Sequence, residues 1–175
     1  MGAMSIEIAN ESGIDVDDAA LIGLARHVLD AMKIHPQADL SILLVDEAAM
    51  EELHVKWMDE PGPTDVLSFP MDELRPPRGD DDGEAEPGLL GDVVICPQVA
   101  ARQGRRAGHG FADEVNLLLT HGILHLLGYD HAQPDEEQEM FGLQAKLLGS
   151  WWEERSARPG ATSGPDAGST DGGLR

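Results

Sequence analysis

Residues 121 to 131 read His121-Gly-Ile-Leu-His125-Leu-Leu-Gly128-Tyr-Asp-His131, and this stretch decides how the rest of the chain is interpreted. On a helix, His121 and His125 project from one face, because residues four apart are neighbours on the helix surface. Gly128 can end that helix in a left-handed conformation and direct His131 back toward the pair. Three imidazoles in this arrangement can bind one metal ion, so we expect a metal site.

The alternative is a structural role, which is the commoner fate of a single histidine. In this stretch, however, three leucines and an isoleucine fill the gaps between the histidines, so the rings should be partly buried and their nitrogens need partners. Three protein ligands with a fourth position left to water are the catalytic form of a zinc site. The pattern favours a hydrolytic centre with one Zn²⁺ on His121, His125 and His131.

The spacing of the three histidines equals that of the metzincin zinc proteases. Those enzymes carry a general-base glutamate directly after the first histidine, whereas this chain has Gly122 there. The missing carboxylate argues strongly against peptide hydrolysis.

Composition limits the classes of partner. The chain has 175 residues, the size of a single domain, which we assign to residues 5–153. Its 12 Lys and Arg stand against 33 Asp and Glu, so the net charge of −21 predicts repulsion from bare phosphate and anionic membranes. A lone cysteine, Cys96, excludes an internal disulfide, and no leader or apolar run indicates export or a membrane span. We therefore expect a cytoplasmic protein without a membrane partner.

Hydrophobic periodicity places the expected elements. Residues 1–4 are interpreted as an upstream start or a cloning remnant, 72–88 as a mobile acidic loop and 156–175 as a disordered tail poor in apolar residues. The helix over residues 111–127 is apolar nearly all round, which predicts a buried central helix with the histidines on its last two turns. Strands are expected over residues 5–10, 39–45, 66–69 and 90–96, and further helices over 16–33, 47–55, 97–106 and 134–152.

Two further groups are candidates for function. Thr64 and Asp65 precede the strand at 66–69, where a capped strand start and a role in a site are equally good interpretations. Arg102, Arg105 and Arg106 lie on one face of their helix, and they form the best candidate contact for an anion. A solvated helix face is the commoner outcome for such a cluster.

Three motifs together resemble the YbeY family of bacterial metal-dependent endoribonucleases. They are the histidine stretch 121–131, Pro-Thr-Asp-Val-Leu-Ser-Phe-Pro at 63–70 and Gly-Asp-Val-Val-Ile at 91–95, and the resemblance extends from about Ile6 to Trp152. It implies an α+β domain with a small mixed four-stranded sheet around a central helix, zinc on the three histidines, and cleavage of single-stranded RNA. It also implies maturation of the 3′ end of small-subunit ribosomal RNA, ribosome quality control, and ribosomal subunits or ribosomal proteins as partners.

One departure from the family concerns substrate binding. Many members carry an arginine just before the Pro-Thr-Asp motif that is thought to contact substrate phosphate, and Met58 stands there in this chain. Lys56, or the cluster of Arg102, Arg105 and Arg106, is a candidate replacement for the lost charge.

The sequence leaves the chemistry and the function class partly open. With Gly122 at the usual base position, proton transfer must use a metal hydroxide, a neighbour such as Asp65 or the RNA 2′-hydroxyl. Thr64 and Ser68 are candidates to bind substrate or orient ligands, and Asp130 is a candidate to hold a ligand histidine. Besides an endoribonuclease, we consider a metzincin-like protease and a non-catalytic ribosome-assembly factor with a structural zinc and acidic faces for basic ribosomal proteins.

Overall fold

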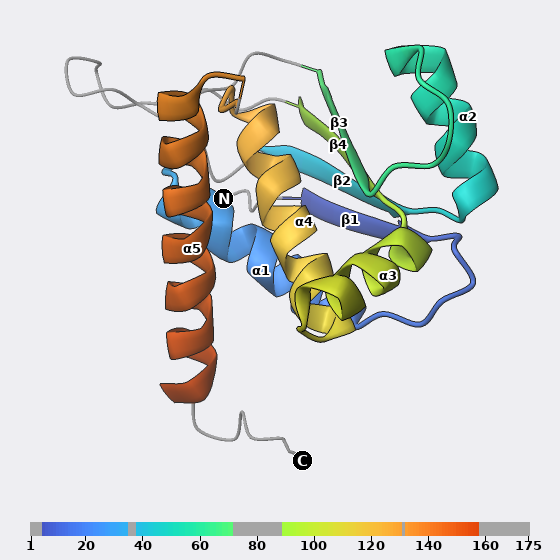
Figure 1. Cartoon of the computed structure of the whole chain (residues 1–175). Helices are drawn as coiled ribbons and strands as arrows, with labels where there is room; N and C mark the ends of the chain where they lie inside the picture. The colour runs from blue at the N-terminus through green and yellow to red at the C-terminus, as the bar shows by residue number, and fades with distance from the viewer. Residues whose placement is uncertain (1–4, 35–37, 72–88, 131, 158–175) are drawn as a thin grey trace.

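The computed structural model describes residues 5–34, 38–71, 89–130 and 132–157, and within them the chain forms four strands and five helices (Figure 1). The strands form one mixed sheet, so the expected α+β class with a small four-stranded mixed sheet is confirmed. In chain order the elements are β1 (Ser5–Asn10), α1 (Asp18–Ala31), β2 (Asp39–Leu44), α2 (Glu47–Met58), β3 (Val66–Pro70), β4 (Leu89–Ile95), α3 (Pro97–Ala107), α4 (Phe111–Leu126) and α5 (Pro134–Ala157).

The sheet has the order β1-β2-β4-β3, with β1, β2 and β4 parallel and β3 antiparallel to β4 at one edge. Because side chains alternate between the faces of a strand, each inner strand contributes to two cores. Leu40 and Ile42 of β2 and Val93 and Ile95 of β4 belong to the main core with α1, α4 and α5. Val94, which lies between two of these residues, belongs to the core on the other face, beneath α2.

The smaller core explains why α2 packs where it does. Met50 of α2 is fully buried against the second face of the sheet, together with Val94 and Cys96. Asp46 begins the helix, since its carboxylate accepts the N–H of Ala49 at 2.9 Å. Cys96 is a buried free cysteine, and burial raises the pKa of its thiol, which lowers its reactivity.

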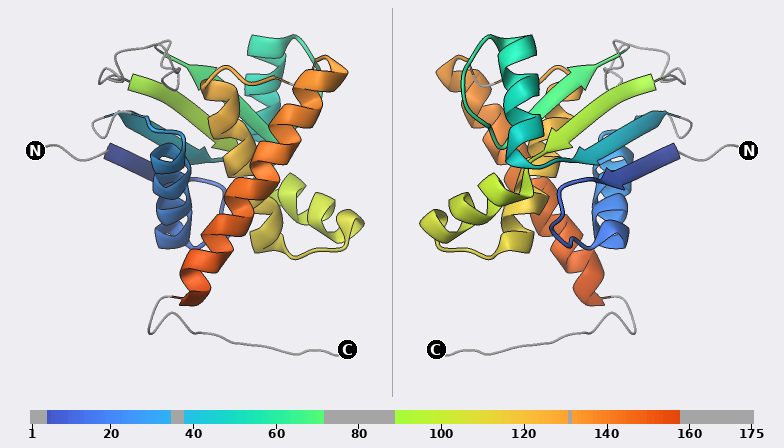
Figure 2. Two further views of the ribbon diagram at one scale, coloured as in Figure 1. Left: turned by 90° about the vertical axis from the view of Figure 1, so that its left-hand side faces the viewer. Right: turned by 90° about the vertical axis from the view of Figure 1, so that its right-hand side faces the viewer.

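Helix α4 is the centre of the fold. It lies between the sheet and α5 and packs against β3, β4, α1, α3 and α5 (Figures 1 and 2). The prediction of a buried central helix is therefore confirmed. Its buried apolar side chains are Val115, Leu118, Leu119, Ile123, Leu124 and Leu126.

Several predicted ends were wrong by a few residues. Helix α2 continues past Val55 to Met58 and ends where Asp59 adopts a left-handed conformation. Helix α5 continues past Trp152 to Ala157, so the expected domain end at 153 and tail start at Ser156 fall inside a helix. Arg155 lies over the Trp151 ring, 5.3 Å from its centroid, and this contact between residues four apart supports the last turns.

Other expectations concern residues outside the described part of the chain. These are the start at 1–4, the acidic loop at 72–88 and the tail from 158 onward. Among the helices that are described, none combines the length and the apolar character needed to cross a membrane.

Gly122 sets how closely α4 approaches the sheet. A Cβ atom on this residue would lie 2.6 Å from Val93 Cγ1, 3.2 Å from Ser68 Oγ and 3.3 Å from Val66 Cγ2. Carbon atoms at optimal contact are about 3.5–4.0 Å apart, so even a methyl group does not fit without movement of the sheet or the helix. The absence of a side chain is therefore a packing requirement.

We predict that Gly122→Ala lowers the free energy of unfolding by about 1–3 kcal/mol, because overpacking outweighs the gain in helix propensity. Denaturant unfolding followed by circular dichroism measures this change. Gly149→Ala is the matched control, since Gly149 is also helical and a Cβ there meets no atom within 4 Å. We expect the control to be neutral or to stabilise the protein by up to about 1 kcal/mol, and an equally stable Gly122→Ala variant would contradict the packing argument.

Candidate functional site

The last two turns of α4 carry His121 and His125 side by side, as the sequence predicts. Their ring centroids are 4.7 Å apart with an interplanar angle of 79°, and both residues are half-buried. Helix α4 ends at Leu126 with Leu127 as its C-cap, and Gly128 follows with a φ of +100°. The N–H of Gly128 donates to His125 O and that of Tyr129 to Leu124 O, both at 3.0 Å, which is the Schellman pattern.

The third predicted ligand, His131, lies outside the described residues. Asp130, the candidate to hold a ligand histidine, is described and exposed. Within residues 5–34, 38–71, 89–130 and 132–157, no group of three or more His, Cys, Asp or Glu side chains is placed to hold a metal ion. The described part of the candidate site is thus the pair His121 and His125.

Helix α5 supplies a hydrogen bond that sequence reasoning missed. His121 Nδ1 lies 2.6 Å from Oε1 of Gln144, whose exposed fraction is only 6%. An amide oxygen can only accept a hydrogen bond, so Nδ1 is the donor, and in the neutral imidazole the lone pair is then on Nε2. The signal in the sequence was a single glutamine inside the apolar stripe of α5, where a buried polar group needs a specific partner.

Strand β3 contacts the helix directly beside the first histidine. The Ser68 hydroxyl donates to the carbonyl oxygen of Gly122 at 2.9 Å, so this predicted candidate does lie next to the histidine pair. This hydrogen bond ties the last turns of α4 to the edge strand.

Thr64 and Asp65 instead form a local turn. Asp65 Oδ1 accepts the N–H of Val66 at 2.8 Å and the hydroxyl of Thr64 at 3.3 Å. The carbonyl oxygen of Asp65 accepts the N–H of Cys96 at 2.9 Å. These contacts favour the capped strand start, one of the two interpretations that the sequence left open.

An aromatic side chain also borders the pair. The Phe141 ring of α5 lies 6.4 Å from the His121 ring, centroid to centroid, and 44% of the residue is exposed. Gln144 comes three residues later on the same helix. One face of α5 therefore presents both the hydrogen-bond partner of His121 and an exposed ring beside it.

The basic candidates lie in other places. Arg102 of α3 forms two hydrogen bonds with Glu47 of α2, at 2.8 and 3.2 Å, and these lower the pKa of the Glu47 carboxyl. Helix α3 packs on the start of α4, where Gly104 approaches Glu114, whereas the histidines lie on the last turns. Neither Arg102 nor its neighbours Arg105 and Arg106 are brought to the histidine pair by this packing.

The end of α2 presents a mainly apolar surface. Lys56 Nζ lies 5.4 Å from the centroid of the Trp57 ring, and the Trp57 ring contacts the Phe69 ring edge-on at 6.0 Å. Met58, which stands in place of the family arginine, is exposed on the same turn. Lys56 is the cation of this turn, and its ammonium group is held beside an aromatic face.

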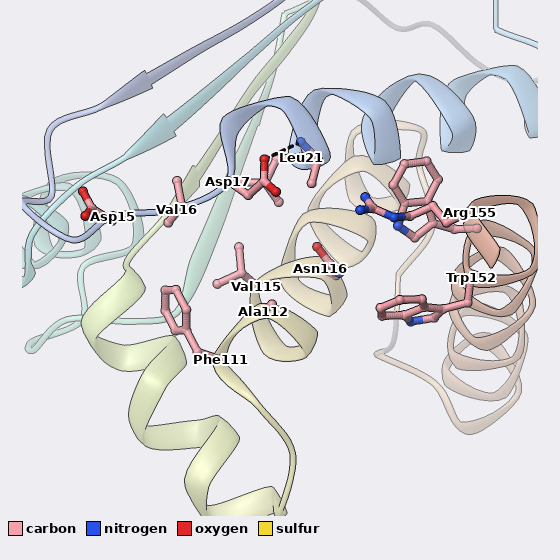
Figure 3. Close-up of a pocket in the computed structure, with 12 residues that line it drawn as sticks. Asp15, Val16, Asp17, Leu21, Phe111, Ala112, Val115, Asn116, Trp152 and Arg155 are labelled. Atoms are coloured by element: carbon pink, nitrogen blue, oxygen red, sulfur yellow. Dashed lines mark hydrogen bonds between the residues drawn. The ribbon is translucent and has the colours of Figure 1, made fainter. Parts of the chain in front are cut away.

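A pocket lies at the opposite end of α4. The pocket of about 410 Å³ is bordered by α1, the start of α4 and the end of α5, and its lining is largely apolar (Figure 3). Asp17 at its rim caps the start of α1, because its carboxylate accepts the N–H of Ala20 at 3.0 Å. This pocket is lined by residues of the opposite end of α4 and does not include the paired imidazoles.

The comparisons with known proteins agree with the motifs. A sequence model of the family described as "Endoribonuclease YbeY" matches residues 6–151. A protein of that name from Thermobifida fusca is 67% identical over 148 residues, which cover 85% of this chain and 94% of that protein. Another from Acidothermus cellulolyticus is 65% identical over 161 residues, covering 90% and 98%.

A solved structure supports the same conclusion at the level of the fold. The solution structure of TM1509 from Thermotoga maritima matches with a TM-score of 0.56 and 26% sequence identity, over 91% of this chain and 96% of that protein. The family match spans the whole sheet and all five helices up to Trp151, and it contains the three motifs. The expected resemblance is therefore confirmed, and the chain belongs to the YbeY family of endoribonucleases.

Proposed function

We propose that this protein is a zinc-dependent endoribonuclease that cleaves single-stranded RNA. Membership of an endoribonuclease family makes it an enzyme that hydrolyses phosphodiester bonds, and relatives that are 65–67% identical carry that name. The observation that carries the metal part of the proposal is the adjacent pair of half-buried imidazoles, one of which is held by a buried amide.

His121, His125 and His131 would hold the zinc ion. The fit rests on the donor chemistry of the described pair, because the hydrogen bond to Gln144 favours the Nδ1–H tautomer of His121, in which Nε2 is the nitrogen with metal-donor character. Gln144 is therefore an orienting residue for a ligand. A bound zinc ion supplies Lewis acidity toward a phosphoryl oxygen and lowers the pKa of a water toward about 7.

Other residues of the chain position this pair. Ser68 ties α4 to β3 through the Gly122 carbonyl, and Asp65 with Thr64 fixes the start of the same strand. We assign all three to positioning. Asp130 remains a proposed support for a ligand histidine.

Gly122 also argues against the protease alternative. The space that a side chain at this position would occupy is filled by Val93 and Ser68, so the close approach of the sheet leaves no room for a general-base glutamate. Membership of an endoribonuclease family also speaks against a protease. It likewise favours an enzyme over an assembly factor with a purely structural zinc.

We propose ribosomal RNA as the substrate, with maturation of the small-subunit 3′ end and ribosome quality control in the cytoplasm as the context. A net charge of −21 gives little attraction to free RNA, so a ribosomal subunit or a basic ribosomal protein would bring the substrate to the site. Lys56, Arg105 and Arg106 are the proposed phosphate contacts, whereas Arg102 is engaged by Glu47.

We predict that His121→Ala and His125→Ala each abolish cleavage of a single-stranded ribosomal RNA fragment and reduce the zinc content of the purified protein. Gel-based cleavage assays and elemental analysis measure the two effects. The matched control is His27→Ala, since His27 bonds to Ser150 between α1 and α5 and lies outside the proposed site. Undiminished cleavage by either α4 variant would refute the proposed site, and cleavage of casein by the wild type would revive the protease alternative.

We predict that Gln144→Ala weakens zinc binding by about 10- to 100-fold, because His121 loses the partner that fixes its tautomer and ring orientation. Competition with a chromogenic chelator measures the affinity without any assay of activity. Gln138→Ala, at an exposed position of the same helix, should bind zinc like the wild type. Equal affinities for Gln144→Ala and the wild type would show that the amide does not orient a ligand.

A further inference from the structure

The geometry points to Phe141 as a positioning residue that stacks on a base of the nucleic-acid strand and holds the strand beside His121. This inference rests on the proposed function, and it adds a base-stacking residue to a site so far described by its histidines. It explains how a strongly acidic protein can bind RNA, and why the strand must be single.

The first step is the location of the ring. Phe141 lies on the second turn of α5, its centroid is 6.4 Å from that of His121, and 44% of the residue is exposed. Figures 1 and 2 show the first half of α5 running along the end of α4 that carries the histidines. A base stacked on this ring would therefore place its own sugar and phosphates within a nucleotide of the histidine pair.

The second step is the rigidity of the platform. Met140, next to Phe141, is fully buried in the main core, and Gln144, one turn further along α5, is fixed by His121. The backbone that carries Phe141 is thus held on both sides of the ring. A stacking surface that is already ordered loses little entropy when a base binds.

The third step is electrostatic. Proteins that rely on Lys and Arg for RNA binding neutralise phosphates, and this chain has 12 such residues against 33 acids, with Arg102 paired to Glu47. Base stacking on an aromatic ring needs no net charge and tolerates any sequence, because every base has a π-face. A base inside a duplex cannot present that face, so stacking on Phe141 selects unpaired RNA.

The test asks whether the Phe141 ring contacts one particular base of the bound strand. The probe is a single-stranded DNA of the sequence of a cleaved ribosomal RNA fragment, which offers the same bases without being a substrate. A series of these strands carries one abasic site each, and fluorescence anisotropy measures the Kd of the zinc-loaded full chain. We expect Phe141→Ala to weaken binding by about 5- to 100-fold and one abasic position to weaken wild-type binding by a similar factor.

The effect of combining Phe141→Ala with an abasic site, which we call the coupling, distinguishes stacking from a merely structural role of Phe141. At the critical abasic position, Phe141→Ala should cause no further loss, and Phe141→Trp should bind the intact strand at least as tightly as the wild type. Phe141→Leu, which keeps apolar volume without a flat ring, should bind as weakly as the alanine variant. The zinc content of all variants should equal that of the wild type.

Trp152→Ala is the matched control, since Trp152 is another exposed aromatic residue of α5, 51% exposed and lining the distant pocket of Figure 3. It lies eleven residues further along the helix, or about 16 Å. We expect its Kd to stay within about twofold of the wild type. The inference would be overturned if Trp152→Ala weakened binding as much as Phe141→Ala. It would also be overturned if the losses of affinity caused by Phe141→Ala and by an abasic site multiplied at every position of the strand.

Cleavage of the corresponding RNA distinguishes this inference from the proposed function. If the coupling is present and the wild type cuts the RNA, Phe141→Ala should raise KM by about the factor seen in Kd. If the coupling is present and no RNA is cut, the stacking site stands and the proposed activity fails. If RNA is cut and the coupling is absent, the inference fails and the activity stands.

Discussion

The fold depends on how closely α4 approaches the β3–β4 edge of the sheet. At Gly122 the helix has no side chain, Val93 fills the space, and Ser68 donates a hydrogen bond to the glycine carbonyl. The same contact that completes the main core therefore places His121 and His125, on either side of Gly122 in the sequence, at the border of that core. Stability and the location of the candidate site follow from one packing arrangement.

The second constraint comes from α5, which holds the histidines from the opposite side. Gln144 is buried and its amide oxygen is used by His121, so the imidazole is fixed between a core helix and a hydrogen-bond acceptor. A buried polar group without such a partner would cost about 1–3 kcal/mol. Gln144 thus satisfies two requirements at once, since its own buried amide oxygen has a hydrogen-bond partner and the ring of His121 is oriented.

The parts of the structure that the sequence predicted are those encoded in local pattern. Strand β1 and the start of α4 at Phe111 were placed correctly, and Gly128 ends α4 in the left-handed turn that its position predicts. Contacts between distant segments were not predictable in the same way. The pairing of His121 with Gln144 joins residues 23 apart in the sequence, and periodicity describes one helix without stating which residues of another helix face it.

The interpretations of Gly122 and of the arginine cluster show the same difference between local pattern and contacts of distant segments. Gly122 was interpreted as a missing general base, and its packing role became visible only when Val93 and Ser68 were brought against it. The cluster of Arg102, Arg105 and Arg106 does lie on one helix, yet α3 packs on the start of α4 and Glu47 takes Arg102. Charge attraction is weak in this chain, and its densest cluster of arginines lies away from the histidines. Under the proposed function we therefore expect affinity for RNA at the site to come largely from contacts with the bases.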